Sequence, residues 1–390
     1  MKAALHPILL LATLAWASCT GSPELTADRK RSAPRQQPDS VCPMVRLEPE
    51  RLPDMNIPRS GQATLCLGRE ILVVGGHTTG FIPTATAELF DGSGWQTITT
   101  TYEHDDPMAL RLSTGQVLVA GGHEKHLGIG QTFPVEMYEP GTKSFRGFGC
   151  LDRKRTFANG VEIDSGRVVI SGNWYAGDSI EIFDGRKFFS HVKEVSAQRA
   201  TPFMIRCAAD NVLVMGSLST RGDTLPFPAI VDRLRGEPFS PPLFEKWHPL
   251  PYLQPGYSGS DYFIGDEARG LYMSLLPVED DEGHVALACV RDTVFSLLPT
   301  ACPVPTRGPW GRIIYGSPVL ADRSARMAYM MAYSMDRRLY ILALNYGQAL
   351  DGGRAPMTLY YTDPQPQMGL ATPVLTADGN LLSAGGSFDD

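Results

Sequence analysis

Short apolar runs alternate with glycine-rich turns along most of the chain. Runs such as Ile71 to Val74 and Val117 to Ala120 are each followed at once by two glycines. Runs this short, rich in valine and isoleucine and bounded by turn residues, are typical of buried strands. No long stretch repeats apolar residues with the 3.6-residue period of a helix, so we expect few helices. The pattern predicts an all-β protein with many turns.

Three segments repeat the same order of strands and turns. Each has a strand of small residues, a turn, a strongly apolar strand that ends in Gly-Gly or Ser-Gly, a loop, a strand with one glutamate, and an aromatic residue. The second strands end at Gly76, Gly122 and Gly172, a spacing of 46 and 50 residues. Such a repeat is one supersecondary unit that buries its faces only against its neighbours. The aligned stretches are ATLCLGREILVVGGH (63–77) with AELFDGSGW (87–95), ALRLSTGQVLVAGGH (109–123) with VEMYEPGTKSF (135–145), and NGVEIDSGRVVISGN (159–173) with IEIFDGRKF (180–188).

This repeat resembles the kelch motif, and its first two strands are similar to those of galactose-oxidase-type propellers. The resemblance is strong over 58–190 and at TPVLTADGNLLSAGGS (372–387). It implies a kelch-like β-propeller of four-stranded antiparallel blades, stacked in a ring because one blade cannot bury both of its faces. We expect one such domain over residues 42–390. Between the strong regions the resemblance is weaker, and the second strands are VLVMGS (212–217), GLYMSL (270–275) and MAYMMAYS (327–334).

The number of blades follows from counting these units. Six units show their first two strands before residue 369, and a seventh begins there but stops after its second strand. An unfinished blade would leave an exposed sheet edge. The segment 42–55 can supply the missing outer strand. We therefore predict seven blades, the last closed by N- and C-terminal segments, with six blades as the alternative.

The N-terminus has the pattern of an export signal. Lys2 precedes a short apolar run, and Ala15-Trp16-Ala17 fits a small-x-small cleavage site. Cys19 follows, in a context that resembles a bacterial lipoprotein signal; Trp16 departs from the usual leucine, so simple secretion is the alternative. We expect a signal peptide over 1–18 and a lipidated Cys19 with a flexible linker over 19–41. The resemblance implies a protein of the bacterial cell envelope, in the periplasm or at the outer membrane, held by its lipid alone.

Composition and cysteine content narrow the partners. A net charge of −7 with 20% charged residues argues against a nucleic-acid partner. Beyond Cys19 there are six cysteines, which permit disulfides in an oxidising compartment. Cys289 and Cys302 flank a predicted strand and are the disulfide that we expect. The alternative is that all six are small buried hydrophobes.

The binding residues of such a fold should lie on one face. The loops after the second strands and the residues before the first strands share that face, and binding residues concentrate on long loops of a rigid scaffold. Arginines there would bind carboxylates, and aromatic rings would stack on sugars. Alternatively, the arginines pair with carbonyls or with blade carboxylates such as Glu88 and Glu181. The candidates are Arg59, His77, His123, Arg155, Trp174, Tyr175, Arg199, Tyr257 and Tyr315.

Motifs for catalysis or metal binding are weak. His77, His123, Glu124 and His126 have the right chemistry for zinc or copper, but loop residues need not converge, so we predict no metal and no cofactor. The acidic run at 280–282 is expected to be a solvated turn, with calcium as the alternative. Galactose oxidase itself needs two histidines, two tyrosines and a cysteine, and no matching set is recognisable. The sequence also lacks GxSxG, HExxH and Walker motifs.

These observations favour a monomeric binding or interaction module for a glycan or protein partner. The alternative is a carbohydrate-active enzyme, an epimerase or lyase of an acidic sugar, that uses the arginines, histidines and tyrosines of the loop-rich face. A structural role in a larger envelope complex is a third hypothesis, because propellers host all three kinds of function.

Overall fold

The first repeat forms one four-stranded antiparallel sheet in a computed structural model of the chain. Its order is β2 (Ala63–Cys66), β3 (Ile71–Val74), β6 (Thr86–Phe90) and β7 (Trp95–Thr99). All four residues of β3 are buried, as expected for a strand covered on both faces. The structure describes residues 42–125, 129–156, 158–164, 166–172, 179–186, 188–194, 203–207, 211–215, 231–233, 248–249, 264–266, 271–291, 294–305, 307–334, 336–365 and 372–386.

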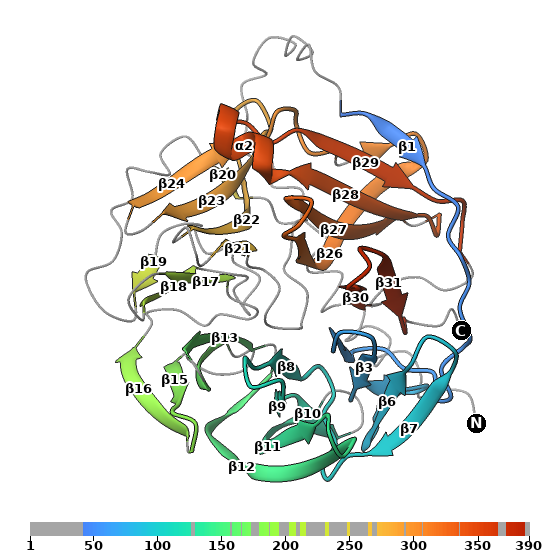
Figure 1. Cartoon of the computed structure of the whole chain (residues 1–390), viewed down its shortest axis with the longest axis vertical. Helices are drawn as coiled ribbons and strands as arrows, with labels where there is room; N and C mark the ends of the chain where they lie inside the picture. Colours follow the sequence, from blue (N-terminus) through green and yellow to red (C-terminus); the bar gives the residue numbers. More distant parts are fainter. Residues whose placement is uncertain are drawn as a thin grey trace, which may run out of the picture. The chain divides into compact units, whose positions relative to one another are not determined.

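The second and third repeats form equivalent sheets (Figure 1). The aromatic residue that ends each aligned repeat lies at or near the start of the fourth strand, at Trp95, Phe145 and Phe188. The second sheet contains β8 (Met108–Arg111), β9 (Val117–Ala120), β11 (Ile129–Glu139) and β12 (Ser144–Arg155), with β10 (His123–Lys125) beside β11. The third sheet contains β13 (Asn159–Asp164), β14 (Arg167–Ser171), β15 (Ser179–Phe183) and β16 (Phe188–Glu194). A separate hairpin of β4 (His77–Thr78) and β5 (Ile82–Pro83) lies between β3 and β6 in the chain of the first repeat.

The weaker repeats also form sheets, and each predicted second strand is present. These strands are β18 (Asn211–Met215), β22 (Leu271–Glu279) and β27 (Met327–Ser334). The sheet of β18 also contains β17 (Phe203–Cys207) and β19 (Val231–Arg233). The sheet of β22 also contains β20 (His248–Pro249), β21 (Ile264–Asp266), β23 (Val285–Arg291) and β24 (Val294–Pro299). The sheet of β27 also contains β25 (Arg307–Gly308), β26 (Gly311–Asp322), β28 (Leu339–Asn345) and β29 (Met357–Tyr361). A short helix, α2 (Tyr346–Gly352), joins β28 to β29, and β30 (Thr372–Leu375) pairs with β31 (Leu381–Ala384).

Successive sheets contact each other through their first strands in a propeller-like arrangement. β2 contacts β8, β8 contacts β13, β13 contacts β17, and β30 contacts both β26 and β2. At three junctions the glycine after a second strand donates its N–H to the carbonyl of the residue that leads into the next sheet: Gly76 to His104, Gly122 to Arg155 and Gly386 to Arg59, at 2.7, 2.8 and 3.1 Å. The last sheet is thus joined to the first in the way that the first is joined to the second. The number of blades stays a prediction, because parts of the middle units lie outside the described residues.

The N-terminal strand corrects one expectation. β1 (Met44–Arg46) does not complete the sheet of β30 and β31; it pairs in parallel with β29, at the edge of another sheet (Figure 1). The buried Cys42, just before it, is part of the core of that sheet. Beyond β1, Pro49 and Pro53 lack the N–H that a further ladder needs. The segment 47–55 therefore forms no strand.

The apolar core lies between consecutive sheets. One cluster joins Leu110 and Leu118 of the second sheet to Ile170 and Phe183 of the third. A smaller one packs Val374 of β30 against the first sheet. Residues 42–390 make up one compact unit. Within the described ranges, the structure contains no helix with the length and apolar character needed to cross a membrane.

Candidate functional site

A buried glutamate in the first sheet holds the segment that leads into that sheet. Glu88 of β6 accepts the backbone N–H groups of Asn56 at 2.7 Å and Ile57 at 3.0 Å. It also pairs with Arg59 at 3.0 Å, and both side chains are fully buried. Arg59 in turn donates to the carbonyl of Gly75, 2.9 Å away, just after the second strand. The guanidinium therefore ties the entry of the sheet to the end of β3.

The third sheet repeats this arrangement. Glu181 of β15 accepts the backbone N–H of Asp152 and pairs with Arg155 at 2.8 Å. Arg155 donates to the carbonyl of Gly172 at 3.1 Å. For Arg59 and Arg155, these two ion pairs agree with the alternative interpretation in which the entry arginines pair with blade carboxylates.

In the second sheet a histidine takes the place of the arginine. His104 lies with Nδ1 2.8 Å from the carbonyl of Gly121 and Nε2 3.8 Å from Glu136. Glu136 accepts the backbone N–H groups of Thr101 and Tyr102, so it holds the entry segment as its counterparts do. Complete burial lowers the pKa of His104, because a charged imidazole would lose its hydration. This position thus has a neutral ring where its counterparts have a guanidinium.

The histidine after the first sheet's second strand joins two sheets. Nε2 of His77 lies 2.8 Å from Oγ of Ser60, and Nδ1 lies 2.7 Å from Oδ1 of Asp105. Ser60 leads into the first sheet, and Asp105 leads into the second. The carboxylate orients the ring, and the ring orients the hydroxyl.

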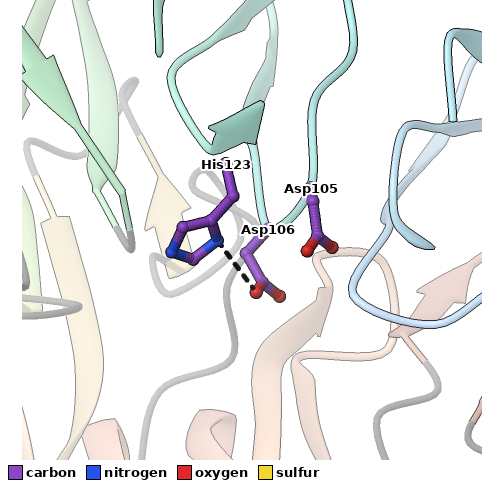
Figure 2. A group of neighbouring side chains, drawn as sticks. All are labelled: Asp105, Asp106 and His123. Atoms are coloured by element: carbon purple, nitrogen blue, oxygen red, sulfur yellow. Dashed lines mark ion pairs between the residues drawn. The ribbon is translucent and has the colours of Figure 1, made fainter. Parts of the chain in front are cut away.

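His123, after the second sheet's second strand, occupies the equivalent position. Its Nε2 is 3.3 Å from Oγ1 of Thr156, which leads into the third sheet. Its Nδ1 lies 3.7 Å from Oδ2 of Asp106, an ion-pair distance rather than a hydrogen bond. Figure 2 shows Asp106 between His123 and Asp105. The two histidine networks therefore meet at adjacent carboxylates.

The backbone places these carboxylates close together. Asp106 has φ 53°, in the left-handed region that residues other than glycine seldom adopt. Its N–H donates to the carbonyl of Gly61 at 2.8 Å. A Cβ on Gly61 would lie 2.8 Å from Oδ1 of Asp105 and 2.9 Å from Oδ1 of Asp106, so only glycine fits beneath the pair. Backbone strain of this kind is concentrated at functional sites.

The cluster has a strong affinity for protons. Burial, and then the charge of Asp106, raise the pKa of Asp105 to about 6. Burial acts to lower the pKa of both histidines, but the two aspartates outweigh it, so the pKa of His77 and that of His123 are both raised. The group therefore favours protonated histidines beside carboxylates.

Among the described residues, two groups have ligand atoms that are close enough to hold a metal ion. In one, atoms of Asp105, Asp106 and His123 all lie within 4.8 Å of one another (Figure 2). The other group consists of Asp280, Glu282 and His284. Its two carboxylates belong to the acidic run at 280–282 that the sequence analysis considered. In that turn Asp280 accepts the backbone N–H of Glu282 at 2.9 Å. Carboxylate and imidazole together suit Zn²⁺ or Mn²⁺ better than Ca²⁺.

The predicted site residues fall into three groups. His77 and His123 come together with Asp105 and Asp106, whereas Arg59 and Arg155 are buried in ion pairs. Asp105 was not among the candidates. The equivalent positions of the three repeats hold Ser60, Asp105 and Thr156, so no shared residue type marks this position in the sequence. Tyr315 lies in β26, where its side chain is outside the described part, and the remaining candidates also lie outside it: Trp174, Tyr175, Arg199 and Tyr257.

Comparison with known proteins identifies the fold. No protein-family model and no curated protein sequence matches the chain. Among solved structures, a fungal alcohol oxidase of the AA5 family, determined in complex with copper, is similar, with a TM-score of 0.55 and 12% sequence identity. The match covers 85% of this chain and 71% of that one. The fold is therefore a β-propeller similar to that of this oxidase.

Similarity to a copper protein raises the question whether this cluster suits a copper-radical centre. The resemblance to galactose oxidase implies two histidines, two tyrosines and a cysteine. The cluster instead offers two histidines and two aspartates, and its other hydrogen-bonding partners are the hydroxyls of Ser60 and Thr156. It provides neither phenolate nor thiolate, so these residues do not fit that centre.

Proposed function

We propose that the chain is an exported binding module with a carbohydrate site at the loop-rich end of its first two sheets. The observation that carries this proposal is the cluster of Asp105, Asp106 and His123, with His77 against it. Carboxylates accept hydrogen bonds from sugar hydroxyls, and imidazole both donates and accepts. Asp106 is the accessible member, since its side chain is 15% exposed whereas that of His123 is 4% exposed.

Asp106, the most exposed charge of the cluster, favours a neutral or amino sugar over an acidic one, because the side chains of His77 and His123 beside it are only 10% and 4% exposed. The two described arginines of this face are both used in ion pairs with Glu88 and Glu181. A carboxylate on the ligand would meet Asp106 with no cation from these arginines to offset it. An epimerase or lyase of acidic sugars would have to obtain its positive charge from other residues.

A binding experiment with a matched pair of variants tests this proposal. The purified chain is screened on an array of neutral, amino and acidic glycans, and binding is then measured by titration calorimetry. Asp106→Asn removes the accessible charge and should weaken binding about tenfold or more, because a hydrogen bond to a charged group contributes about 1.5–3 kcal/mol. Asp91→Asn, in an exposed turn between β6 and β7, is the control and should bind as the parent does.

Each outcome of the screen has a clear meaning. Binding of neutral or amino sugars that Asp106→Asn weakens and Asp91→Asn preserves supports the carbohydrate site. A preference for acidic sugars would contradict it. If no glycan binds but a protein partner is captured in an Asp106-dependent way, the module binds protein instead.

We also propose that Cys19 carries a lipid that holds the module in the bacterial cell envelope. The proposal is supported by the small-x-small site before Cys19 and the polar, proline-containing linker that follows it. The parent protein, expressed in bacteria, should incorporate labelled palmitate and remain with the membranes. Cys19→Ala should lose both properties, whereas the control Ser22→Ala should keep them. A parent protein released without label would mean simple secretion.

A second candidate function, ester or amide hydrolysis, is favoured by one observation. Ser60, His77 and Asp105 have the geometry of a nucleophile, its base and the group that orients the base, at 2.8 and 2.7 Å. Against it, Thr156 and His123 make a similar contact at the next junction, and Ser60 is only 6% exposed. A fluorophosphonate probe that labels the parent but not Ser60→Ala would establish hydrolysis. Absence of labelling would leave these contacts with the role of joining sheets.

A further inference from the structure

Two buried cysteines from distant parts of the chain lie side by side. Cys42 and Cys302 are 5% and 4% exposed and belong to the same apolar cluster, around β29. The two thiols are near enough for each to shift the pKa of the other, and the backbone of β29 acts on both, through Leu359 on Cys42 and through Met357 on Cys302. Backbone groups two residues apart on a strand face the same edge of that strand. Met357 and Leu359 are two residues apart, so both thiols lie at the same edge of β29.

The surrounding backbone holds both cysteines in place. Pro43, next to Cys42, accepts the N–H of Leu359 at 2.8 Å, and Ala301, next to Cys302, donates to the carbonyl of Ala355 at 2.8 Å. Both thiols are thus carried by segments that are docked onto β29 and onto the residues just before it. In this structure both cysteines are free thiols.

The register of the neighbouring hairpin argues against Cys289 as the partner of Cys302. Cys289 lies opposite Ser296, whereas Thr300, two residues before Cys302, bonds back to Val285. Val285 and Cys289 are four residues apart on β23, about 13 Å along a strand. A disulfide requires Cα atoms within about 7 Å, so the pairing that we expected from the sequence does not suit this geometry.

We propose that Cys42 and Cys302 form a disulfide bond that fastens the start of the propeller to the sheet containing β29. The bond requires an oxidant, for which we name a dithiol oxidase or a small-molecule disulfide of the oxidising compartment. The thiolate of Cys302 attacks that disulfide and releases one thiolate. The thiolate of Cys42 then attacks the sulfur of Cys302 and releases the second, so two electrons and the two thiol protons pass to the oxidant.

The arrangement favours Cys302 as the first nucleophile. The Cys42 thiol lowers the pKa of Cys302, whereas the Cys302 thiol and then burial raise the pKa of Cys42. Because both sulfurs are buried in the folded protein, we expect the exchange to occur during folding, before β1 docks.

The bond would strengthen a weak attachment. β1 has three residues, all with exposed side chains, and pairs with β29 through its backbone. It follows directly after the segment expected to link the domain to the membrane. With the disulfide in place, the covalent bond between Cys42 and Cys302 bears a force that pulls on that segment, and β1 stays paired with β29. The inference rests on the expected export and is independent of the carbohydrate proposal.

Peptide mapping tests the bond directly. The full chain, expressed with its own N-terminus in bacteria, is isolated from the envelope, alkylated under denaturing conditions and digested without reductant. Mass spectrometry should find the peptides of Cys42 and Cys302 linked, two hydrogens lighter than the separate peptides. A second sample, reduced, unfolded and refolded with glutathione disulfide, should show the same link even if export fails. Alkylated Cys42 and Cys302 in the refolded sample, or a link from Cys302 to Cys289, would overturn the proposal.

Thermal unfolding provides a second measurement. Cys42→Ser and Cys302→Ser should each lower the midpoint by about 5 °C or more, since a native disulfide that closes a long loop is strongly stabilising. Dithiothreitol should lower the parent by a similar amount and leave both variants unchanged. The control Cys66→Ser, at a thiol that donates to the carbonyl of Gly68, should respond to dithiothreitol as the parent does. A parent protein that is insensitive to dithiothreitol would contradict the disulfide.

Discussion

At the scale of single residues, the entry arginines act as structural clamps. Arg59 is fully buried and bonds to Glu88 and to a carbonyl at the end of β3. Arg59→Ala would leave the carboxylate buried without its cation, which should lower the free energy of unfolding by about 3–5 kcal/mol. Denaturant titration measures this loss. Arg51→Ala, which removes a solvent-exposed pair with Asp54, is the control and should have little effect; equal losses for the two variants would contradict the clamp.

The aspartate and histidine cluster should make stability depend on pH. The folded pKa of Asp105 is raised to about 6, and that of His77 is raised above its ordinary value. Both groups therefore bind protons more tightly in the folded state. Their contribution is fully present below the ordinary pKa of each group and is lost as pH rises through the folded pKa, so stability falls with rising pH across this range.

This dependence is measured by comparing unfolding at pH 5 and pH 8. Asp105→Asn removes one titrating group and the charge that raises the pKa of His77. The parent should therefore lose more stability than the variant between the two pH values, by about 2 kcal/mol. His104, whose pKa is lowered by burial, acts in the opposite direction but is common to both proteins. Parallel curves for parent and variant would show that the cluster does not take up protons on folding.

At the scale of the strand, the glycine after β3 allows neighbouring sheets to approach closely. Gly75 has φ 70°, and a Cβ there would lie 2.0 Å from the carbonyl oxygen of His104. Gly75→Ala should therefore destabilise the protein by several kcal/mol through backbone strain and overlap together. Gly92→Ala is a matched control, because Gly92 has φ 97° but nothing within 4 Å of the added atom. It should cost only the strain, about 1 kcal/mol; equal melting points for the two variants would show that the close approach has no energetic role.

Elements of the repeat could be predicted because each leaves a pattern in the sequence. A strand buried on both faces is continuously apolar, and its closing glycines mark its end, so β3, β9 and β14 are recognisable. β1 could not be placed, because three exposed residues carry no pattern and their position depends on how Cys42 packs. The site was predicted only in part. His77 and His123 follow from the glycine motif, but the aspartates that join them depend on a strained turn that the residue types do not reveal.

At the scale of the whole molecule, joining the last sheet to the first decides whether the sheets unfold together. Nε2 of Gln62 donates to the carbonyl of Ala384 at 2.8 Å, and Thr372 donates to the carbonyl of Gln62 at 3.0 Å. Gln62→Ala removes the first bond, which costs about 1 kcal/mol. Because this junction holds the C-terminal hairpin, that hairpin should become the first site of proteolysis in the variant.

Limited proteolysis followed by mass spectrometry measures this opening. In the parent, cleavage near residues 372–386 should be as slow as cleavage within the first sheet, because the junctions on both sides of that sheet share one kind of glycine-to-carbonyl bond. In Gln62→Ala it should become several-fold faster, while the exposed control Gln96→Ala should match the parent. Faster cleavage of the hairpin already in the parent would mean that the junction opens independently of the other sheets. The propeller would then behave as an open chain of blades whose ends touch without closing a cooperative ring.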